Sequence, residues 1–405
     1  MRSRLFYGWV ILGAAFLIIM MGIGLIFSLS VFLPPLQETF GWGRSTISAA
    51  ALINWLVFGV ASFAWGTLSD RIGARTVVLS GGILFGAGML LASRITEEWH
   101  LYLTFGLLGG IGISAFYVPL TSTATRWFTT RRGLAVAIVS AGNGLGILVM
   151  SPLARILISA FGWRATFLIF GLLAWAVVIP CALLIRNRPE DLGVSAYGGA
   201  PNETRRGMTS SEALRSRPFW LIALAHFFCC AGHSGPIFHM VAHAMDLGIP
   251  KLAAATLLGW SGATSIPGRI ATGLFADRYG AKTALVSMLT LQAAVVASYL
   301  VAHHLLSLYA VSTFFGIAYG GVMPLYALVA REYFGDKVMG TAYGAIFFIS
   351  SLGMGLGSYA GGWAFDLLGS YHLLYVASVL MALTAIGVAA NLRAPRLAHA
   401  YAQRT

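Results

Sequence analysis

Twelve long apolar runs, separated by short polar breaks, constrain the fold of this chain more than any other feature. Each run is close to the roughly 20 residues that an α-helix needs to cross a hydrocarbon layer. The runs are continuous rather than alternating, which excludes a transmembrane β-barrel. Hydrophobic residues make up 58% of the chain and charged residues 10%, as in integral membrane proteins. We predict an all-α membrane protein with twelve transmembrane helices, at residues 7–33, 44–68, 76–94, 99–125, 133–159, 164–186, 218–243, 252–276, 283–302, 304–330, 340–365 and 371–392.

Positive charges are divided unevenly between the two sets of loops. Of the 26 Lys and Arg residues, 20 lie in segments on the side of both chain ends, five lie on the other side, and Arg269 lies within a span. Because short loops rich in Lys and Arg stay in the cytoplasm, we predict cytoplasmic termini and insertion in a plasma (inner) membrane. This bias accounts for the net charge of +13, and no basic stripe of the kind that binds nucleic acid is present.

The two halves of the chain repeat each other. GTLSDRIGAR at residues 66–75 corresponds to GLFADRYGAK at residues 273–282, an offset of 207. The one long polar segment, 187–217, is rich in Pro, Gly, Ser and charges, which is typical of a linker. We predict a six-helix bundle at 1–186, a cytoplasmic linker at 187–217 with a short helix near its end, and a second six-helix bundle with a short tail at 218–405. Parallel repeats of this kind are typical of secondary transporters.

Arg269 lies inside the apolar run at 252–276. Eight residues separate it from Asp277, which is about 12 Å along a helix and therefore close to the membrane centre. An arginine at this depth costs at least about 2.5–3.5 kcal/mol on insertion scales, so it should face a cavity rather than lipid. All thirteen acidic residues lie in loops or at span ends, which favours an anionic ligand that supplies the missing charge. The alternative is a structural arginine bonded to backbone carbonyl groups.

The repeated G-x-x-x-D-R-x-G-x-[RK] loops resemble the signature loop of the major facilitator superfamily. The region after the fourth span is similar to the monocarboxylate transporter family, whose relatives exchange oxalate and formate. This similarity is carried by Trp127 and Phe128, Arg131 and Arg132, Gly142, Gly144, Gly146 and Pro152, and by YGWV at Tyr7. The resemblance implies the major facilitator fold, transport of a small monocarboxylate such as lactate or pyruvate, and a carboxylate-binding role for Arg269 in the eighth span.

The sequence departs from that family at three places. Phe27 stands where animal members carry a lysine, and Ser265 stands where they carry an aspartate one turn before the arginine. Residues 341–365 contain no Lys or Arg, whereas oxalate-exchanging relatives carry a second cation there. One cation favours a monocarboxylate over a dianion. Without the aspartate, the chain lacks a residue of that family's proton-coupling route.

A short organic acid has one charged end and one modest apolar end, so we expect aromatic and small polar side chains around Arg269. Ser265 belongs to a polar stripe with Arg269 at helical spacing. His233 either holds a proton or bonds to a neighbouring hydroxyl group. Each candidate also fits a packing role inside a span. The predicted substrate-binding residues are Arg269, Tyr117, Asn143, His233, Ser265, Tyr319 and Phe347.

The two repeated loops place an Asp–Arg pair at a helix end. Asp70 and Asp277 can cap a neighbouring helix or pair with a cation, while Arg71 and Arg278 can bind carbonyl groups or acids at helix C-termini. We predict that these four residues form a gate that closes the cytoplasmic side in the outward-open arrangement and breaks when the bundles rock. Topogenic charge alone is the alternative.

Together these patterns indicate a proton-coupled secondary transporter that works by alternating access, and not an enzyme. The three cysteines, Cys181, Cys229 and Cys230, lie in apolar runs, and neither a disulfide framework nor a metal site is indicated. No phosphate-binding loop is present, and no cofactor is expected. The expected partners are a carboxylate, a proton and membrane lipid, with the protein as a monomer. The alternatives are an anion exchanger of the oxalate/formate type and a transporter-like carboxylate sensor.

Overall fold

The computed structural model describes residues 6–128, 132–198, 209–334 and 338–393, and most of them are helical. Within these ranges, ten segments are long and apolar enough to cross a membrane. The segment Leu134–Leu184 contains two helices, because Gly162 (φ 78°) breaks the helical backbone between them. The helix Lys251–Tyr279, of 29 residues, is also long enough to span a membrane and carries the polar stripe around Arg269. Counted in this way, the described chain contains the twelve spanning helices that the apolar runs predict, and the all-α fold class is confirmed.

The first half of the chain begins with a longer span than predicted. α1 ends at Phe27, but α2 continues past residue 33 to Phe40 and includes Pro34 and Pro35. The elements are α1 (Tyr7–Phe27), α2 (Leu29–Phe40), α3 (Arg44–Ile72), α4 (Ala74–Ala92), α5 (Glu98–Leu101), η1 (Tyr102–Leu108), α6 (Gly109–Ser114), α7 (Tyr117–Trp127) and α8 (Arg132–Leu184). α5, η1, α6 and α7 together form the fourth span.

The second half follows two short helices of the polar segment, η2 (Pro189–Leu192) and α9 (Ser210–Arg215). α9 is the short helix expected near the end of the linker, and Thr209 caps its first turn by accepting a hydrogen bond from the Glu212 amide. The remaining elements are α10 (Arg217–Asp246), α11 (Lys251–Tyr279), α12 (Ala281–Ser298), α13 (Leu305–Phe334), α14 (Met339–Leu368) and α15 (His372–Ala390).

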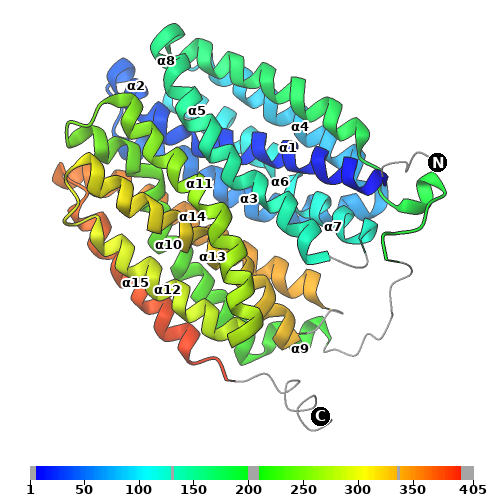
Figure 1. Ribbon diagram of the computed structural model, residues 1–405. Helices are drawn as coiled ribbons and strands as arrows, with labels where there is room; N and C mark the ends of the chain where they lie inside the picture. The colour runs from blue at the N-terminus through cyan, green and yellow to red at the C-terminus, as the bar shows by residue number, and fades with distance from the viewer. Residues whose placement is uncertain (1–5, 129–131, 199–208, 335–337, 394–405) are drawn as a thin grey trace.

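The helices of each half pack mainly on one another. α1 and α4 lie against α8, whereas α10 packs on α14 and α15, and α11 packs on α13. The first half, blue to green, occupies the upper right of Figure 1 and the second half, green to red, the lower left. The most extensive contacts between them, among the described residues, are those of α3 with α14, of α8 with α11 and of α2 with α10. These contacts surround the space in which the functional site lies.

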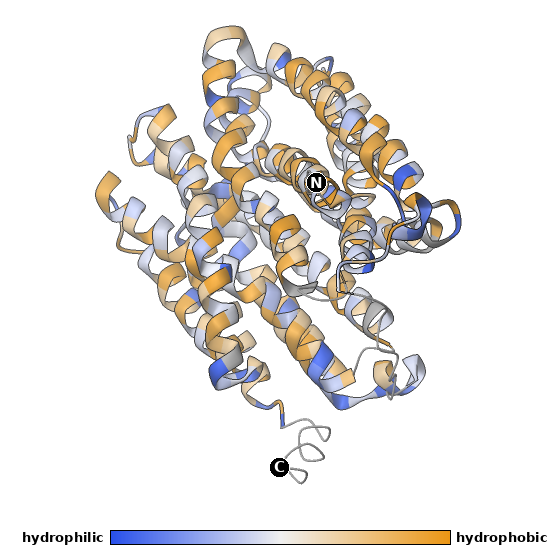
Figure 2. Cartoon of the chain, turned by 45° about the vertical axis from the view of Figure 1, so that its right-hand side comes forward, coloured by the Kyte–Doolittle hydropathy of each residue, from blue (hydrophilic) through white to orange (hydrophobic). Residues whose placement is uncertain are grey.

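The outer surface of the helices is apolar. Figure 2 shows hydrophobic residues along most of each helix, with the most hydrophilic residues mainly at helix ends and in connections. Ile83, Leu172 and Leu380 each expose half or more of their surface. Large apolar side chains exposed on helices long enough to cross a bilayer face lipid. The protein is therefore a multi-pass integral membrane protein.

Glycine allows the close contact between α1 and α8. A Cβ atom at Gly146 would lie 2.3 Å from the carbonyl oxygen of Met20, and one at Gly24 would lie 2.6 Å from the carbonyl oxygen of Gly146. Both obstacles are backbone atoms, which cannot move without separating the helices. The small-residue run after the fourth span therefore serves helix packing at this position.

We expect Gly146→Ala to lower the stability of the protein by about 1–3 kcal/mol, because the added methyl group overpacks a backbone contact. The measurement is the melting temperature of the purified protein in detergent, which should fall by several degrees. Gly13→Ala on α1 is the matched control, since a Cβ atom there meets nothing within 4 Å. Equal melting temperatures for the two variants would show that the α1–α8 contact tolerates a wider separation.

Candidate functional site

A cavity of about 1790 Å³ lies between the two halves. It opens at the face that carries the first and last described residues, here called the terminal face. There Phe6 packs on Trp127 with ring centroids 5.7 Å apart, and the Tyr333 hydroxyl donates to the carbonyl oxygen of Arg393. The cavity mouth is lined by Arg126, Arg188, Glu190 and Arg331. Among the described lining residues, Glu190 at the mouth is the one acid, so the interior of the cavity lacks a carboxylate.

Arg269 projects from α11 into this cavity. Its Nη1 donates a 2.9 Å hydrogen bond to the carbonyl oxygen of Ser140 on α8, and its Nε has no hydrogen-bond partner among the described residues. The guanidinium group therefore links the two halves and still has donor capacity for an anion. A structural role for Arg269 predicts hydrogen bonds to backbone carbonyl groups. The bond to Ser140 is of this kind, but it uses only one nitrogen of the guanidinium group.

Four other predicted substrate-binding residues line the same cavity: Tyr117, Asn143, Tyr319 and Phe347. The Tyr117 hydroxyl lies 3.4 Å from Oγ of Ser140, the residue whose carbonyl group binds Arg269. The rings of Tyr117 and Phe347 are stacked across the two halves, with centroids 6.4 Å apart. Asn143 Oδ1 has no hydrogen-bond partner in the described structure. The fold thus brings these four side chains and Arg269 to one space.

His233 and Ser265 are not among the residues that line the cavity. Ser265 is fully buried, and its Oγ donates to the carbonyl oxygen of Gly262 at 2.7 Å. His233 is 1% exposed and packs its ring edge-on against Tyr319, with centroids 5.1 Å apart. Both lie behind the lining, where they support α11 and Tyr319. Direct contact of either side chain with a substrate stays a prediction.

The two repeated Asp–Arg loops have the same backbone. Gly73 and Gly280, which follow α3 and α11, have φ values of 88° and 86° and ψ values of 150° and 148°. Arg71 is exposed, and the Arg278 guanidinium lies 5.4 Å from the ring centroid of the neighbouring Tyr279. The side chains of Asp70 and Asp277 lie outside the described residues. The gate predicted at this face therefore stays a prediction.

The face opposite the terminal face is closed by a network around Arg44, one of the five cations that the sequence places on this side. Arg44 is 7% exposed, and its Nη1 and Nη2 bind the two carboxylate oxygens of Asp246 at 2.6 and 2.7 Å. Nη1 also donates to the Tyr371 hydroxyl at 2.7 Å. The backbone amides of Arg44 and Ser45 each donate to Asp366 at 2.8 Å. The start of α3 is thereby joined to the end of α10, the end of α14 and Tyr371.

Aromatic and histidine side chains complete this closure. The Arg44 guanidinium lies 3.6 Å from the ring centroid of Phe365. His239 on α10 hydrogen-bonds the Tyr371 hydroxyl at 3.0 Å through Nδ1, and its Nε2 lies 2.9 Å from the Ser358 carbonyl oxygen. A sequence signal for this network exists: Asp246 and Asp366 end the seventh and eleventh spans on the side where Arg44 begins the second. The pairing itself needs the tertiary arrangement.

No group of three or more His, Cys, Asp or Glu in the described ranges is arranged to hold a metal ion.

The sequence matches the Major Facilitator Superfamily over residues 11–358 and 275–401. It is 31% identical to "Monocarboxylate transporter 13" of Bos taurus, over 94% of this chain and 88% of that protein. It is 30% identical to "Monocarboxylate transporter 3" of Rattus norvegicus, over 93% of this chain and 80% of the relative.

The fold also resembles a solved structure of low sequence identity. This is the crystal structure of a bacterial homolog of the human lysosomal transporter Spinster, in an inward-facing and unoccupied conformation. The TM-score is 0.74 at 17% identity, with 96% of each chain covered. At that identity the likeness concerns the fold alone.

Proposed function

Because the chain belongs to the monocarboxylate transporter family of the major facilitator superfamily, and is a transporter of a small molecule rather than an enzyme, we propose that it carries a small monocarboxylate, such as lactate or pyruvate, together with a proton. The observation that carries this proposal is Arg269, a cation in a cavity whose described interior has no acidic side chain. Its unpaired Nε and the hydroxyl group of Tyr117, which lies beside Ser140, suit one carboxylate group.

The transport mechanism that we propose is alternating access. The cavity is open at the terminal face, while the Arg44 network seals the opposite face. Residues 1–186 and 218–405 would rock as two bundles about Arg269, with 187–217 as the linker. The excess of Lys and Arg at the terminal face supports a cytoplasmic position for it in a plasma (inner) membrane, with both termini inside. The arrangement is then open to the cytoplasm, and the protein acts as a monomer.

In this mechanism three groups of residues have different tasks. Arg269, Tyr117, Asn143, Tyr319 and Phe347 contact the substrate. His233 and Ser265 hold the lining in place, and Asp70, Arg71, Asp277 and Arg278 close the terminal face after rocking. Breaking the Arg44 network opens the opposite face in the same movement, because the bundles pivot about the site between these two faces.

Proton coupling predicts that a pH gradient drives uptake. In proteoliposomes with an outside one pH unit more acidic than the inside, we expect labelled lactate to accumulate about tenfold, the limit for one proton per anion. A protonophore should remove this accumulation. Accumulation that does not respond to the gradient, with rapid counterflow against internal oxalate or formate, would instead support the exchanger. Robust net flux would exclude a sensor.

A further inference from the structure

Beyond Arg269, the cavity is lined by a continuous set of aromatic rings, here called the aromatic wall: Phe27, Trp55, Phe58, Phe347 and Tyr117. Successive ring centroids are 6.2 Å apart from Phe27 to Trp55, 5.4 Å to Phe58, 5.8 Å to Phe347 and 6.4 Å to Tyr117. The rings come from α1, α3, α7 and α14, so both halves contribute. Tyr117 places one end of the wall beside the residue that binds Arg269.

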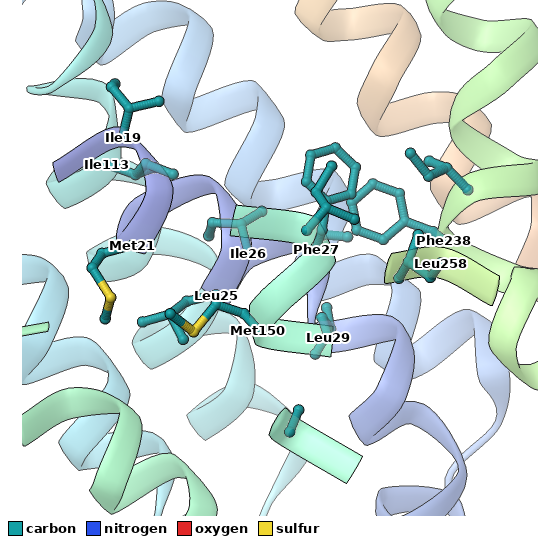
Figure 3. Packing of buried hydrophobic residues seen from close by; sticks show 14 of the residues in the cluster. Ile19, Met21, Leu25, Ile26, Phe27, Leu29, Ile113, Met150, Phe238 and Leu258 are labelled. Atoms are coloured by element: carbon teal, nitrogen blue, oxygen red, sulfur yellow. The ribbon is translucent and has the colours of Figure 1, made fainter. Parts of the chain in front are cut away.

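The other end of the wall lies deeper, toward the closed face. In the repeat, Ser62 on α3 corresponds to Arg269 on α11, and Trp55 is seven residues further from the terminal face. Seven residues of helix rise by about 10 Å, so the wall extends about this far beyond the cation. It ends where the Phe27 ring stacks on Phe238 of α10, with centroids 5.2 Å apart, as Figure 3 shows.

Two serine hydroxyl groups beside the wall are already engaged, whereas Nε1 of Trp55 in the wall has no hydrogen-bond partner among the described residues. The hydroxyl groups of Ser350 and Ser351 line the cavity, but both donate to the carbonyl oxygen of Phe347, at 2.8 and 2.9 Å. Lactate has three carbon atoms, and with its carboxylate on Arg269 it would leave most of the wall facing water. A planar apolar group on the same acid would cover these rings, and burial of that surface stabilises the bound state.

We propose that the site selects aryl monocarboxylates, whose carboxylate binds Arg269 and whose ring packs on the aromatic wall. This inference rests on the proposed function and names its substrate class. Phe27 is central to this inference. It stands where animal members of the family carry a lysine, and its ring closes the deep end of the cavity. A compound with a second carboxylate would place an anion against apolar rings and is disfavoured.

The test compares two acids that differ only by a phenyl group, L-lactate and L-3-phenyllactate, with the full-length protein in proteoliposomes. We expect kcat/KM for phenyllactate to exceed that for lactate by about tenfold to a hundredfold, the effect of burying one phenyl group. Phenyllactate should also raise the melting temperature of the detergent-solubilised protein at concentrations where lactate does not. Lactate transport at equal or higher kcat/KM would overturn the inference.

Substitutions locate the preference on the wall. Phe58→Leu should lower the ratio of kcat/KM for phenyllactate to kcat/KM for lactate by about fivefold or more, because the bound phenyl group loses one ring contact. Phe314→Leu on α13 is the matched control, because that ring is 52% exposed on the outside of the helix, and its ratio should equal that of the parent. An unchanged ratio in Phe58→Leu would overturn the assignment to the wall. Arg269→Gln tests the proposed function separately. If that function is correct, this variant loses transport of both acids; if it is wrong, the variant still transports both.

Discussion

Replacing Arg269 with glutamine should reduce monocarboxylate uptake to about 1% of the parent rate or less. The substitution removes the cation that a buried carboxylate needs, and loss of one partner of a buried charge pair costs about 3–5 kcal/mol, or at least a hundredfold. Lysine should restore little, because its ammonium group cannot keep the Ser140 bond and also present a planar pair of donors to the anion. Initial uptake of labelled substrate into proteoliposomes, normalised to reconstituted protein, measures this effect.

Arg94→Gln is the matched control, since Arg94 is an exposed arginine outside the cavity. It should transport at the parent rate. Size-exclusion profiles and melting temperatures of both variants establish whether each folds. Parent-like uptake by folded Arg269→Gln protein would remove Arg269 from the substrate site and, with it, the main support for an anionic substrate.

The second large effect is expected at the closed face. In Asp246→Asn the Arg44 side chain, which is 8% exposed, loses its bidentate carboxylate, whose own side chain is 35% exposed. Loss of the anionic partner of a cation buried in this way is unfavourable. Because the proposed mechanism breaks this pair when the face opens, the lost energy should shift the population toward the arrangement open on that side. We expect uptake to fall about tenfold or more, since an equilibrium shift of 1.4 kcal/mol already changes populations by that factor.

A cysteine introduced behind the Arg44 network would measure the opening of this face directly. Ser48 lies one turn along α3 from Arg44, is 4% exposed, and its Oγ is 3.3 Å from Nε2 of His239. In a background without Cys181, Cys229 and Cys230, we expect Asp246→Asn to increase the reaction of Ser48→Cys with a membrane-impermeant thiol reagent about tenfold. The reagent is added at the face opposite the chain termini.

An exposed ion pair on the same face provides the control for this experiment. Lys251 and Glu38 are 3.4 Å apart, with side chains 50% and 63% exposed, and such pairs contribute about 0–1 kcal/mol. Lys251→Gln should therefore leave uptake and labelling close to the parent values. Slow uptake in Asp246→Asn without faster labelling of Ser48→Cys would mean that the Arg44 pair stabilises the fold and does not act as a gate.

Much of the architecture follows from the order of residues along the chain. Spanning helices are read from runs of apolar residues because each must satisfy its own backbone in lipid. The repeat between 66–75 and 273–282 predicts equivalent loops, and Gly73 and Gly280 indeed share one backbone conformation with positive φ. The depth of Arg269 follows from counting residues along one helix. All of these properties are local or periodic, so the sequence alone is enough.

The composition of the cavity depends on contacts between helices that are distant in sequence. Tyr117 and Ser265 both lie on polar or mixed helix surfaces, yet Tyr117 reaches the cavity, whereas the Ser265 hydroxyl group packs against α8 at Gly144 and the Ser265 backbone packs against α13 at Gly320. Helical periodicity gives the direction of a side chain around its own axis, but it does not identify the helix that packs there. Candidates chosen by depth alone therefore include residues of the lining and residues behind it.

The sequence by itself thus determined the number of spans, the duplication and the position of one cation at mid-membrane, because these follow from hydropathy, spacing and helical rise. Only the tertiary structure decided that Arg44 pairs with Asp246, 202 residues away, and that rings from four helices form one wall beside Arg269. Such contacts depend on the packing of one bundle against the other. No local pattern of residues encodes which side chains meet across that interface.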